Sequence, residues 1–187
     1  MHGVPAENDM TETKRIKLNL GCGNDWMRGP VINVDCRNLL PPDDSVSFLR
    51  ADLTDLAHYL EPGCADEIWA KDVLEHFPQT ETERLLDRWL ALLVVGGILH
   101  LKTPELGALA KYLLRDDIDS TTKGFQVYGG QDYAENFHRA GFTMRRLQEL
   151  LVARGMMVME ARVVEDTNAY IRAVKVNGGS DGARNSG

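Results

Sequence analysis

The sequence lacks the patterns that mark several classes of protein. Its three cysteines are odd in number and widely spaced, with no C-x-x-C pair, which argues against a disulfide framework and a zinc site. The five histidines show no H-E-x-x-H or similar ligand spacing, so no metal site is predicted. No apolar run reaches the roughly 18 residues of a membrane span, and the polar start MHGVPAENDMTETK does not resemble a secretory signal. We therefore expect a cytoplasmic protein.

Basic residues are also scarce relative to acidic ones. Lysine and arginine total 21 against 28 aspartates and glutamates, the net charge is −7, and no basic cluster could follow a phosphate backbone. Nucleic acids and anionic membranes are therefore not expected as partners. The 187 residues, 43% of them hydrophobic, suit one domain with a substantial core. The oligomeric state is not indicated by the sequence.

Strands and helices are expected to alternate between two polar ends. Residues 1–14 and 178–187 should be disordered, leaving one domain over residues 15–177. Apolar runs predict seven strands, over residues 16–20, 31–35, 46–52, 66–70, 98–103, 156–164 and 169–176. This alternation predicts an α/β domain with a mostly parallel sheet. Only residues 165–168 join the last two strands, too few for a parallel crossover, so that pair must be antiparallel.

Two helices are expected in the first half of the chain. A short one is predicted over residues 54–60. The segment 80–97 has an apolar helical face, a capping box formed by Thr80 and Glu83, and a helix stop at Gly96–Gly97.

The second half combines two predicted helices with a segment that has no sustained period. Pro104 suits the first turn of a helix over 104–115, and Thr143 is expected to cap a helix that ends before Gly155. Between them, residues 115–137 contain polar clusters, glycines and scattered aromatics. A long irregular segment of this kind is often a lid or a binding loop.

The stretch LNLGCGNDWMRGPVINVD indicates a nucleoside site. Ligands of doubly wound sheets bind beyond the carboxyl ends of the strands, where Gly21 and Gly23 would let the backbone approach a ligand closely. Asp35 ends the next strand and could accept hydrogen bonds from two ribose hydroxyls. Asp52 ends the third strand and could accept one from an adenine amino group.

The same stretch departs from the dinucleotide fingerprint. Trp26 stands where the third glycine would be, and a full helix does not fit between Gly23 and Pro30. A pyrophosphate would lack its anion site, so a ligand without phosphates is favoured. This interpretation requires a tight parallel crossover between the first two strands. The alternative is a loose antiparallel hairpin, which would place Asp35 about 16 Å from the glycines.

Six segments, in order, carry a resemblance to a known family. They are LNLGCG, NVDCR, RADLTD, ADEIWAKDVLEHF, GGILHLKTPE and YGGQDYAENFHRAGFTMRRLQELLVARGM. Together they resemble the class I S-adenosylmethionine-dependent methyltransferases of the small, type-11-like kind, over residues 16–176. The resemblance implies a Rossmann-like, seven-stranded, mostly parallel sheet with the last strand antiparallel and helices on both faces. It also implies S-adenosylmethionine as cofactor and S-adenosylhomocysteine as product.

The resemblance further implies roles for individual residues. The glycine loop would lie against the methionine portion of the cofactor, Asp35 would hold the ribose, and Asp52 with Leu53 would flank the adenine. The expected cofactor-binding residues are Leu20, Gly21, Cys22, Gly23, Asp35, Cys36, Asp52, Leu53, Ala70, Lys71 and Asp72. Lys71 is unusual beside a sulfonium cation, because like charges repel. We expect its side chain to point away or to hold a carboxylate.

The acceptor pocket must come mainly from residues 104–142, since the chain has little material beyond the sheet. The candidate substrate-binding residues are Tyr128, Gln131, Tyr133 and Asn136. They would suit a small-molecule acceptor with a hydroxyl or amine, such as a sugar, a sugar-bearing metabolite or a phenolic compound. His138 is the first candidate for a general base and His76 the second, and each also has a purely structural interpretation.

Two other functions stay open at this point. A nicotinamide-dependent oxidoreductase is one, although the missing third glycine counts against it. A non-catalytic module that binds the cofactor without a productive acceptor site is the other.

Overall fold

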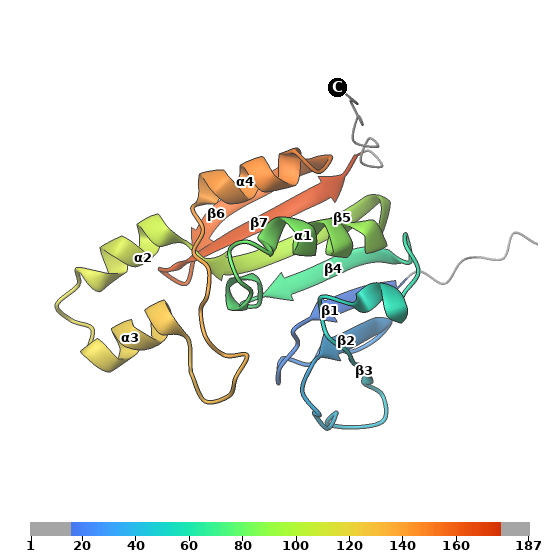
Figure 1. Ribbon diagram of the computed structural model, residues 1–187, viewed down its shortest axis with the longest axis horizontal. Helices are drawn as coiled ribbons and strands as arrows, with labels where there is room; N and C mark the ends of the chain where they lie inside the picture. The colour runs from blue at the N-terminus through green and yellow to red at the C-terminus, as the bar shows by residue number, and fades with distance from the viewer. Residues whose placement is uncertain (1–15, 177–187) are drawn as a thin grey trace, which may run out of the picture.

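One seven-stranded sheet, with strand order β3-β2-β1-β4-β5-β7-β6, organises the chain (Figure 1). The computed structural model describes residues 16–176, and the ends expected to be disordered lie outside the described residues. The strands are β1 Ile16–Leu20, β2 Val31–Asp35, β3 Ser47–Arg50, β4 Ala65–Lys71, β5 Leu93–Pro104, β6 Met156–Val164 and β7 Asn168–Lys175. Neighbours pair in parallel except for β7, which is antiparallel to both β5 and β6. The predicted seven-stranded, mostly parallel sheet with its last strand antiparallel is confirmed.

The connection between β1 and β2 is a parallel crossover, as the nucleoside hypothesis requires, and the hairpin alternative is wrong. The crossover contains no helix. Instead, the Asn33 side chain hydrogen-bonds both backbone groups of Met27, each at 2.9 Å, and accepts a bond of 2.9 Å from Asn19 Nδ2. Trp26 meets Phe48 of β3 edge-on, with ring centroids 5.5 Å apart. These contacts hold a short segment against the sheet where a crossover helix would otherwise pack.

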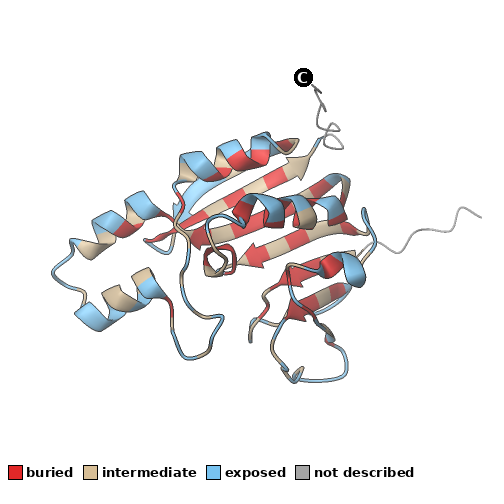
Figure 2. Cartoon of the chain, in the orientation of Figure 1, coloured by how far each residue is buried: buried red, intermediate tan, exposed pale blue. Residues whose placement is uncertain are grey.

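The core lies between one face of the sheet and two helices. The α-helices are α1 Thr82–Leu92, α2 Leu106–Leu113, α3 Ser120–Tyr128 and α4 Met144–Val152. Rows of residues in register across the strands, such as Leu18, Ile68, Leu99 and Ala173, are fully buried under α1 and α4 (Figures 1 and 2). Trp89 of α1 is also fully buried and donates a 3.0 Å hydrogen bond to the carbonyl of Leu53.

Helices were expected on both faces of the sheet, but α1 and α4 cover the same one. The connections β1–β2 and β2–β3, which would carry helices to the opposite face, contain no helix in the described residues. The opposite face presents polar and aromatic side chains, among them Glu67, Trp69 and His100, which stand in the alternate positions of β4 and β5. Trp69 and His100 stack there with ring centroids 3.6 Å apart.

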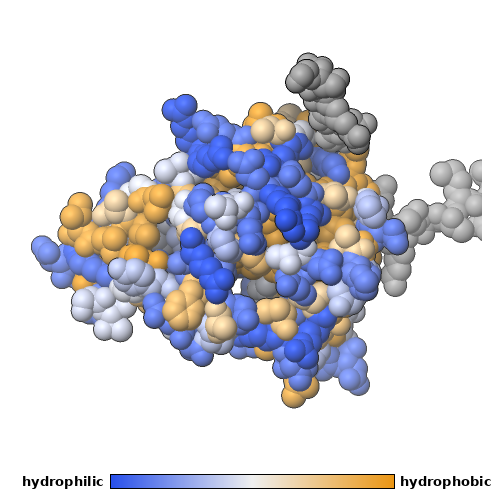
Figure 3. Space-filling model, viewed as in Figure 1, coloured by the Kyte–Doolittle hydropathy of each residue, from blue (hydrophilic) through white to orange (hydrophobic). Residues whose placement is uncertain are grey.

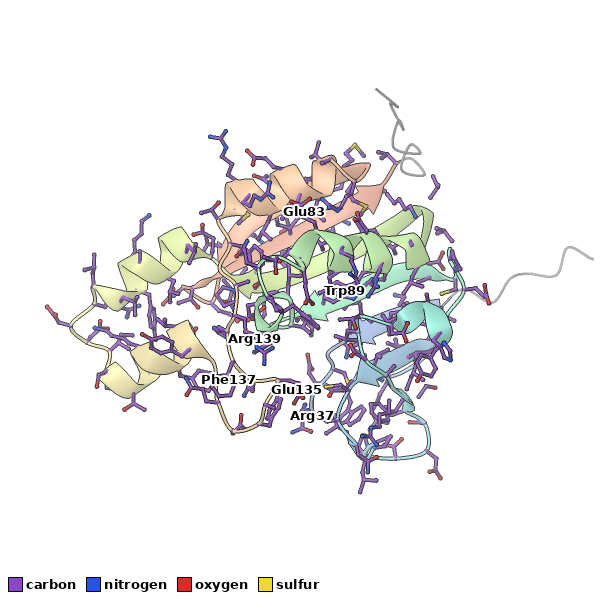
Figure 4. The ribbon with its side chains drawn as sticks, in the orientation of Figure 1. Arg37, Glu83, Trp89, Glu135, Phe137 and Arg139 are labelled. Carbon is purple, nitrogen blue, oxygen red and sulfur yellow. The ribbon has the colours of Figure 1, made fainter. Side chains whose placement is uncertain are left out.

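The ends of α1 differ from their prediction. The capping box is absent, because α1 begins at Thr82 and its N-cap residue makes no side-chain cap hydrogen bond. The carboxylate of Glu83 instead pairs with Arg146, at 2.7 Å, and with Arg154, at 3.2 Å, which ties α1 to the α4 region (Figure 4). The helix also stops before Gly96–Gly97, since Leu93 already pairs with β4.

Other helices and strands also begin or end at residues that differ from the predicted ones. The helix predicted over 54–60 is a single 3-10 turn, Leu56–His58, and Pro104 ends β5 instead of starting α2. The segment predicted to be irregular contains α3, which Asp119 caps by accepting hydrogen bonds from two backbone amides. None of the residues of α3 is buried, so the sequence carries no apolar period there (Figure 2). Thr143 caps α4 as predicted.

Helices α2 and α3 project from the edge of the sheet where β5 ends (Figure 1). Hydrophobic side chains are exposed on this pair, including Leu106 and Phe125 (Figure 3). None of the helices in residues 16–176 combines the length and the apolar character needed to cross a membrane.

Candidate functional site

A cavity of about 820 Å³ opens at the carboxyl ends of β1, β2, β4 and β5, between the sheet edge and the segment that follows α3. This is the edge at which open α/β sheets bind ligands. The volume lies in the range of pockets that hold cofactors and other small molecules. The residues of the cavity wall discussed below are Gly21, Cys22, Gly23, Asp35, Cys36, Arg37, Asp52, Leu53, Lys71, Asp72, Glu75, His76, Tyr133, Glu135, Asn136, His138 and Arg139.

The glycine turn and Asp35 meet at this edge. Gly21 and Gly23 both have positive φ, of 62° and 52°, which turns the backbone sharply after β1. The amide of Gly23 donates a 2.9 Å hydrogen bond to Asp35 Oδ2, and the amide of Cys22 donates one of 3.0 Å to the carbonyl of Val34. The predicted juxtaposition of glycines and acid is therefore present.

Asp35 is held as a buried carboxylate by the residue two positions later. Arg37 donates to Asp35 Oδ1 from its backbone amide at 2.9 Å and from Nε at 3.1 Å. Burial acts to raise the pKa of Asp35, but hydrogen bonds from Arg37 and from the amide of Gly23 outweigh it, so the pKa is lowered. Asp35 therefore offers a negative charge at the floor of the cavity.

Nine of the eleven residues expected to bind the cofactor line the cavity. The two exceptions are Leu20 and Ala70, which are fully buried in the core and support the edge from below. Asp52 lines the cavity and accepts hydrogen bonds of 2.8 Å from both the amide and the hydroxyl of Thr54. Its carboxylate is thereby oriented at the end of the third strand, beside Leu53.

The residues after β4 are also oriented by specific partners. Lys71 pairs with the carboxylate of Asp25, as expected for a lysine at this position. Asp72 has a positive φ of 53°, and its carboxylate is held by Lys102 Nζ at 2.8 Å and Asn168 Nδ2 at 3.3 Å. The strained backbone of Asp72 is thus stabilised by contacts from β5 and β7.

Both candidate bases lie in the same wall of the cavity. The rings of His76 and His138 are 5.1 Å apart, centroid to centroid, and the buried carboxyl group of Glu75 lies beside them. The backbone explains this proximity, because the carbonyl of Glu75 accepts hydrogen bonds of 2.7 Å and 3.1 Å from the amides of Arg139 and Ala140.

Burial dominates the acid–base properties of this cluster. It lowers the pKa of His76 and of His138, and the charge of His76 lowers that of His138 further, so both rings are neutral at pH 7. Burial also raises the pKa of Glu75 to about 8, even though Thr103 Oγ1 donates a 2.8 Å hydrogen bond to Glu75 Oε2. The other carboxylate oxygen, Oε1, is buried and has no hydrogen-bond partner among the described residues.

The segment after α3, which also carries His138, supplies the wall that faces the sheet edge. Of the four candidate substrate-binding residues, Tyr133 and Asn136 line the cavity, whereas Tyr128, 61% exposed, and Gln131 are not part of its wall. The guanidinium of Arg37 lies 4.4 Å from the centre of the Tyr133 ring.

Among the charged residues of the cavity wall that were not predicted from the sequence are Arg37, Glu135 and Arg139. Figure 4 shows Glu135 and Arg139 on the segment after α3, with Glu135 toward Arg37 of the β2 end. No periodic pattern marks them. Arg37 alone had a local signal, a cation two positions after the predicted acid.

We expect Gly21→Ala to destabilise the protein and deform the cavity edge. A β-carbon at this residue would overlap the side chain of Val73, and alanine is strained at a φ of 62°. The expected loss is roughly 1–3 kcal/mol in the free energy of unfolding, measured by denaturant titration. Gly29→Ala is the matched control, because Gly29 also has positive φ, of 91°, but open space around it. An equal loss in both variants would show that the contact with Val73 is unimportant.

Comparisons with known proteins show the fold of the chain. No family model and no curated protein sequence matches it. It is similar to the 1,6-didemethyltoxoflavin-N1-methyltransferase of Burkholderia thailandensis, solved with 1,6-didemethyltoxoflavin and S-adenosylhomocysteine. The identity is 19% over 87% of this chain and 71% of that one, with a TM-score of 0.59. An S-adenosylmethionine-dependent methyltransferase from Mesorhizobium loti is 16% identical over 85% and 90% of the two chains, with a TM-score of 0.58.

The chain therefore has the Rossmann-like fold of the class I S-adenosylmethionine-dependent methyltransferases, as the sequence resemblance implied. The [4+2]-cyclase SpnF shares this fold, at 14% identity over 86% of this chain and 74% of that one, with a TM-score of 0.57. A common fold thus accommodates more than one reaction, and the function has to be argued from the site.

Proposed function

We propose that the protein is an S-adenosylmethionine-dependent methyltransferase that acts on a hydroxyl or amine of a small-molecule acceptor. One observation carries the proposal: the glycine turn and the buried carboxylate of Asp35 meet, through the 2.9 Å bond from Gly23, at the edge of a cavity large enough for a nucleoside and an acceptor. When bound, the cofactor supplies an electrophilic methyl group on a sulfonium.

The residues at the sheet edge fit this cofactor. Gly21 leaves no room for a side chain, so the backbone itself forms the surface on which the methionine portion would lie. Asp35 offers a carboxylate to the two ribose hydroxyls. Asp52 and Leu53 offer a polar and an apolar contact at the adenine end.

The Lys71 ammonium does not oppose a sulfonium here, because Asp25 neutralises it. Asp72 lines the same side of the cavity, and its carboxylate is paired with Lys102 Nζ at 2.8 Å. Cys22, Cys36 and the backbone of Lys71 and Asp72 complete the proposed contacts.

The wall formed by the segment after α3 and by His76 suits an acceptor that has to be aligned with the methyl group and deprotonated. Tyr133 and Asn136 offer polar groups for orientation, and alignment in a closed pocket contributes most of the rate in such displacements, up to ~7–11 kcal/mol. His138 and His76 are neutral and can accept a proton from a hydroxyl. No basic patch suggests a nucleic-acid substrate, and we propose the cytoplasm as the site of action.

The oxidoreductase alternative fits the site less well. A dinucleotide places its pyrophosphate at the N-terminus of the helix that follows the first strand. The crossover between β1 and β2 contains no helix, so the described residues offer no such anion site next to Gly21 and Gly23.

Calorimetric titration of the purified protein with S-adenosylhomocysteine, with NAD in parallel, tests the proposal. We expect saturable binding of S-adenosylhomocysteine alone, followed by a screen of metabolites for methyl transfer. Binding of NAD, or of neither compound, would contradict it. Cofactor binding without turnover on any acceptor would favour the non-catalytic module.

A further inference from the structure

The group formed by Glu75, His76 and His138 has the composition of a transition-metal site. Each residue offers one ligand atom, and these three atoms all lie within 4.8 Å of one another. Two imidazoles and one carboxylate are a ligand set found around zinc and around non-haem iron. Bonds to such ions are about 2.0–2.2 Å long, so a bound ion would draw the three atoms together slightly.

The carboxylate is an independent sign of a missing partner. Glu75 is only 1% exposed, and its Oε1 atom has no hydrogen-bond partner among the described residues. A buried carboxyl oxygen without a hydrogen-bond partner is unusual in folded proteins, and a bound cation is one way to satisfy it. The second oxygen, Oε2, accepts a 2.8 Å hydrogen bond from the hydroxyl of Thr103. Carboxylates that bind metals are commonly oriented by a hydrogen bond of this kind from a residue that does not itself contact the ion.

The histidines are oriented as metal ligands usually are. His76 Nδ1 donates a hydrogen bond of 3.2 Å to the backbone carbonyl of Phe137, the kind of backbone contact that commonly fixes the ring of a metal-binding histidine. His138 directly follows Phe137 and is held near Glu75 by the two amide bonds from Arg139 and Ala140. Both rings line the cavity, so an ion between them would be open to a ligand from that side.

We propose that Glu75, His76 and His138 bind a divalent first-row transition-metal ion in the wall of the cavity. The two imidazoles favour ions such as Zn²⁺ over Mg²⁺ or Ca²⁺, which prefer oxygen ligands. Where the proposed methyl transfer holds, the bound ion, and not a free imidazole, would lower the pKa of the acceptor hydroxyl, so His138 acts as a general base only in the metal-free chain. This role of the ion points to hydroxyl over amine acceptors. Binding of the ion itself does not depend on that function.

Titration of the full chain, stripped with a chelator, with Co²⁺ and Zn²⁺ in the absence of cofactor tests the site. We expect a visible Co²⁺ absorption band that Zn²⁺ abolishes and that Mg²⁺ leaves unchanged. Glu75→Gln, His76→Gln and His138→Gln should each weaken binding by about 100-fold, the upper end of the losses seen when only a supporting residue is removed. His58→Gln is the control, because His58 is exposed and outside the cavity wall.

Circular dichroism identifies the variants that fold, and any one folded ligand variant suffices for the comparison. The proposal is overturned by the absence of saturable Co²⁺ and Zn²⁺ binding, by ligand variants that bind as tightly as the unmodified chain, or by a preference for Mg²⁺. Because no cofactor is present, these outcomes are distinct from a failure to bind S-adenosylhomocysteine.

Discussion

Asp35→Ala is expected to weaken binding of S-adenosylhomocysteine by about 100-fold or more. The carboxylate would make two charge-assisted hydrogen bonds to the ribose, each contributing roughly 1.5–3 kcal/mol, and nothing else at the end of β2 can replace them. The lowered pKa of Asp35 keeps the group ionised across the neutral range, so the loss should be the same at pH 6 and pH 8. Calorimetry gives both affinities directly.

The Asp35→Ala measurement requires controls, because Asp35 also accepts the hydrogen bond from Gly23 that holds the glycine turn. Asp35→Asn keeps an acceptor for the amide of Gly23 but removes the charge, so it separates turn structure from ribose binding. Asp43→Ala is the matched surface variant, since Asp43 pairs with Arg28 outside the cavity wall. Unchanged affinity in Asp35→Ala would contradict the assignment of the ribose site.

His138→Ala is expected to lower turnover by about 10²–10⁴-fold while the affinity for S-adenosylhomocysteine stays within about twofold. His138 lines the acceptor side of the cavity, away from the glycine turn, and is held there through the backbone of its neighbours. The measurement is the rate of S-adenosylhomocysteine release with an acceptor found in the screen. An equal loss of turnover and cofactor affinity would show that the residue is structural.

The pH profile of the unmodified enzyme, stripped of metal with a chelator, offers a second check on the role of His138 as a base. Burial and the neighbouring His76 lower the pKa of His138, so the ring is uncharged at neutral pH and becomes protonated only in more acidic solution. Turnover should therefore be constant near pH 7 and fall as the pH drops below the ordinary histidine value of about 6.5. A fall that begins above pH 7 would contradict the role of His138.

The strands and the sheet edge could be predicted because they depend on local patterns. Apolar alternation predicted β1, β2 and β6 residue for residue, and the short last connection predicted the antiparallel strand. Once parallel strands are assumed, residues after their carboxyl ends must lie together, which is why Gly21, Asp35 and Asp52 were found.

The remaining features depend on contacts that no local pattern records. The α3 helix buries none of its residues and so lacks an apolar period. Glu83 does not form its expected cap but pairs with arginines 63 and 71 residues later in the chain. Glu75 and His138 meet only because the backbone after α3 bonds to the carbonyl of Glu75. Ligand spacing in the sequence could not show a cluster assembled in this way.

Arg37 contacts both halves of the proposed site, the half that would bind the cofactor and the half that would bind the acceptor. Its guanidinium bonds the same carboxylate that the ribose would use, and it also lies against Tyr133 in the acceptor wall. A ribose bound to Asp35 would compete with the guanidinium of Arg37 for the carboxylate. Because Arg37 also lies against Tyr133, a displaced Arg37 would change the position of the Tyr133 ring, and binding of the cofactor would alter the surface that receives the acceptor. The affinities for the cofactor and for the acceptor must then be linked to the same extent in both directions.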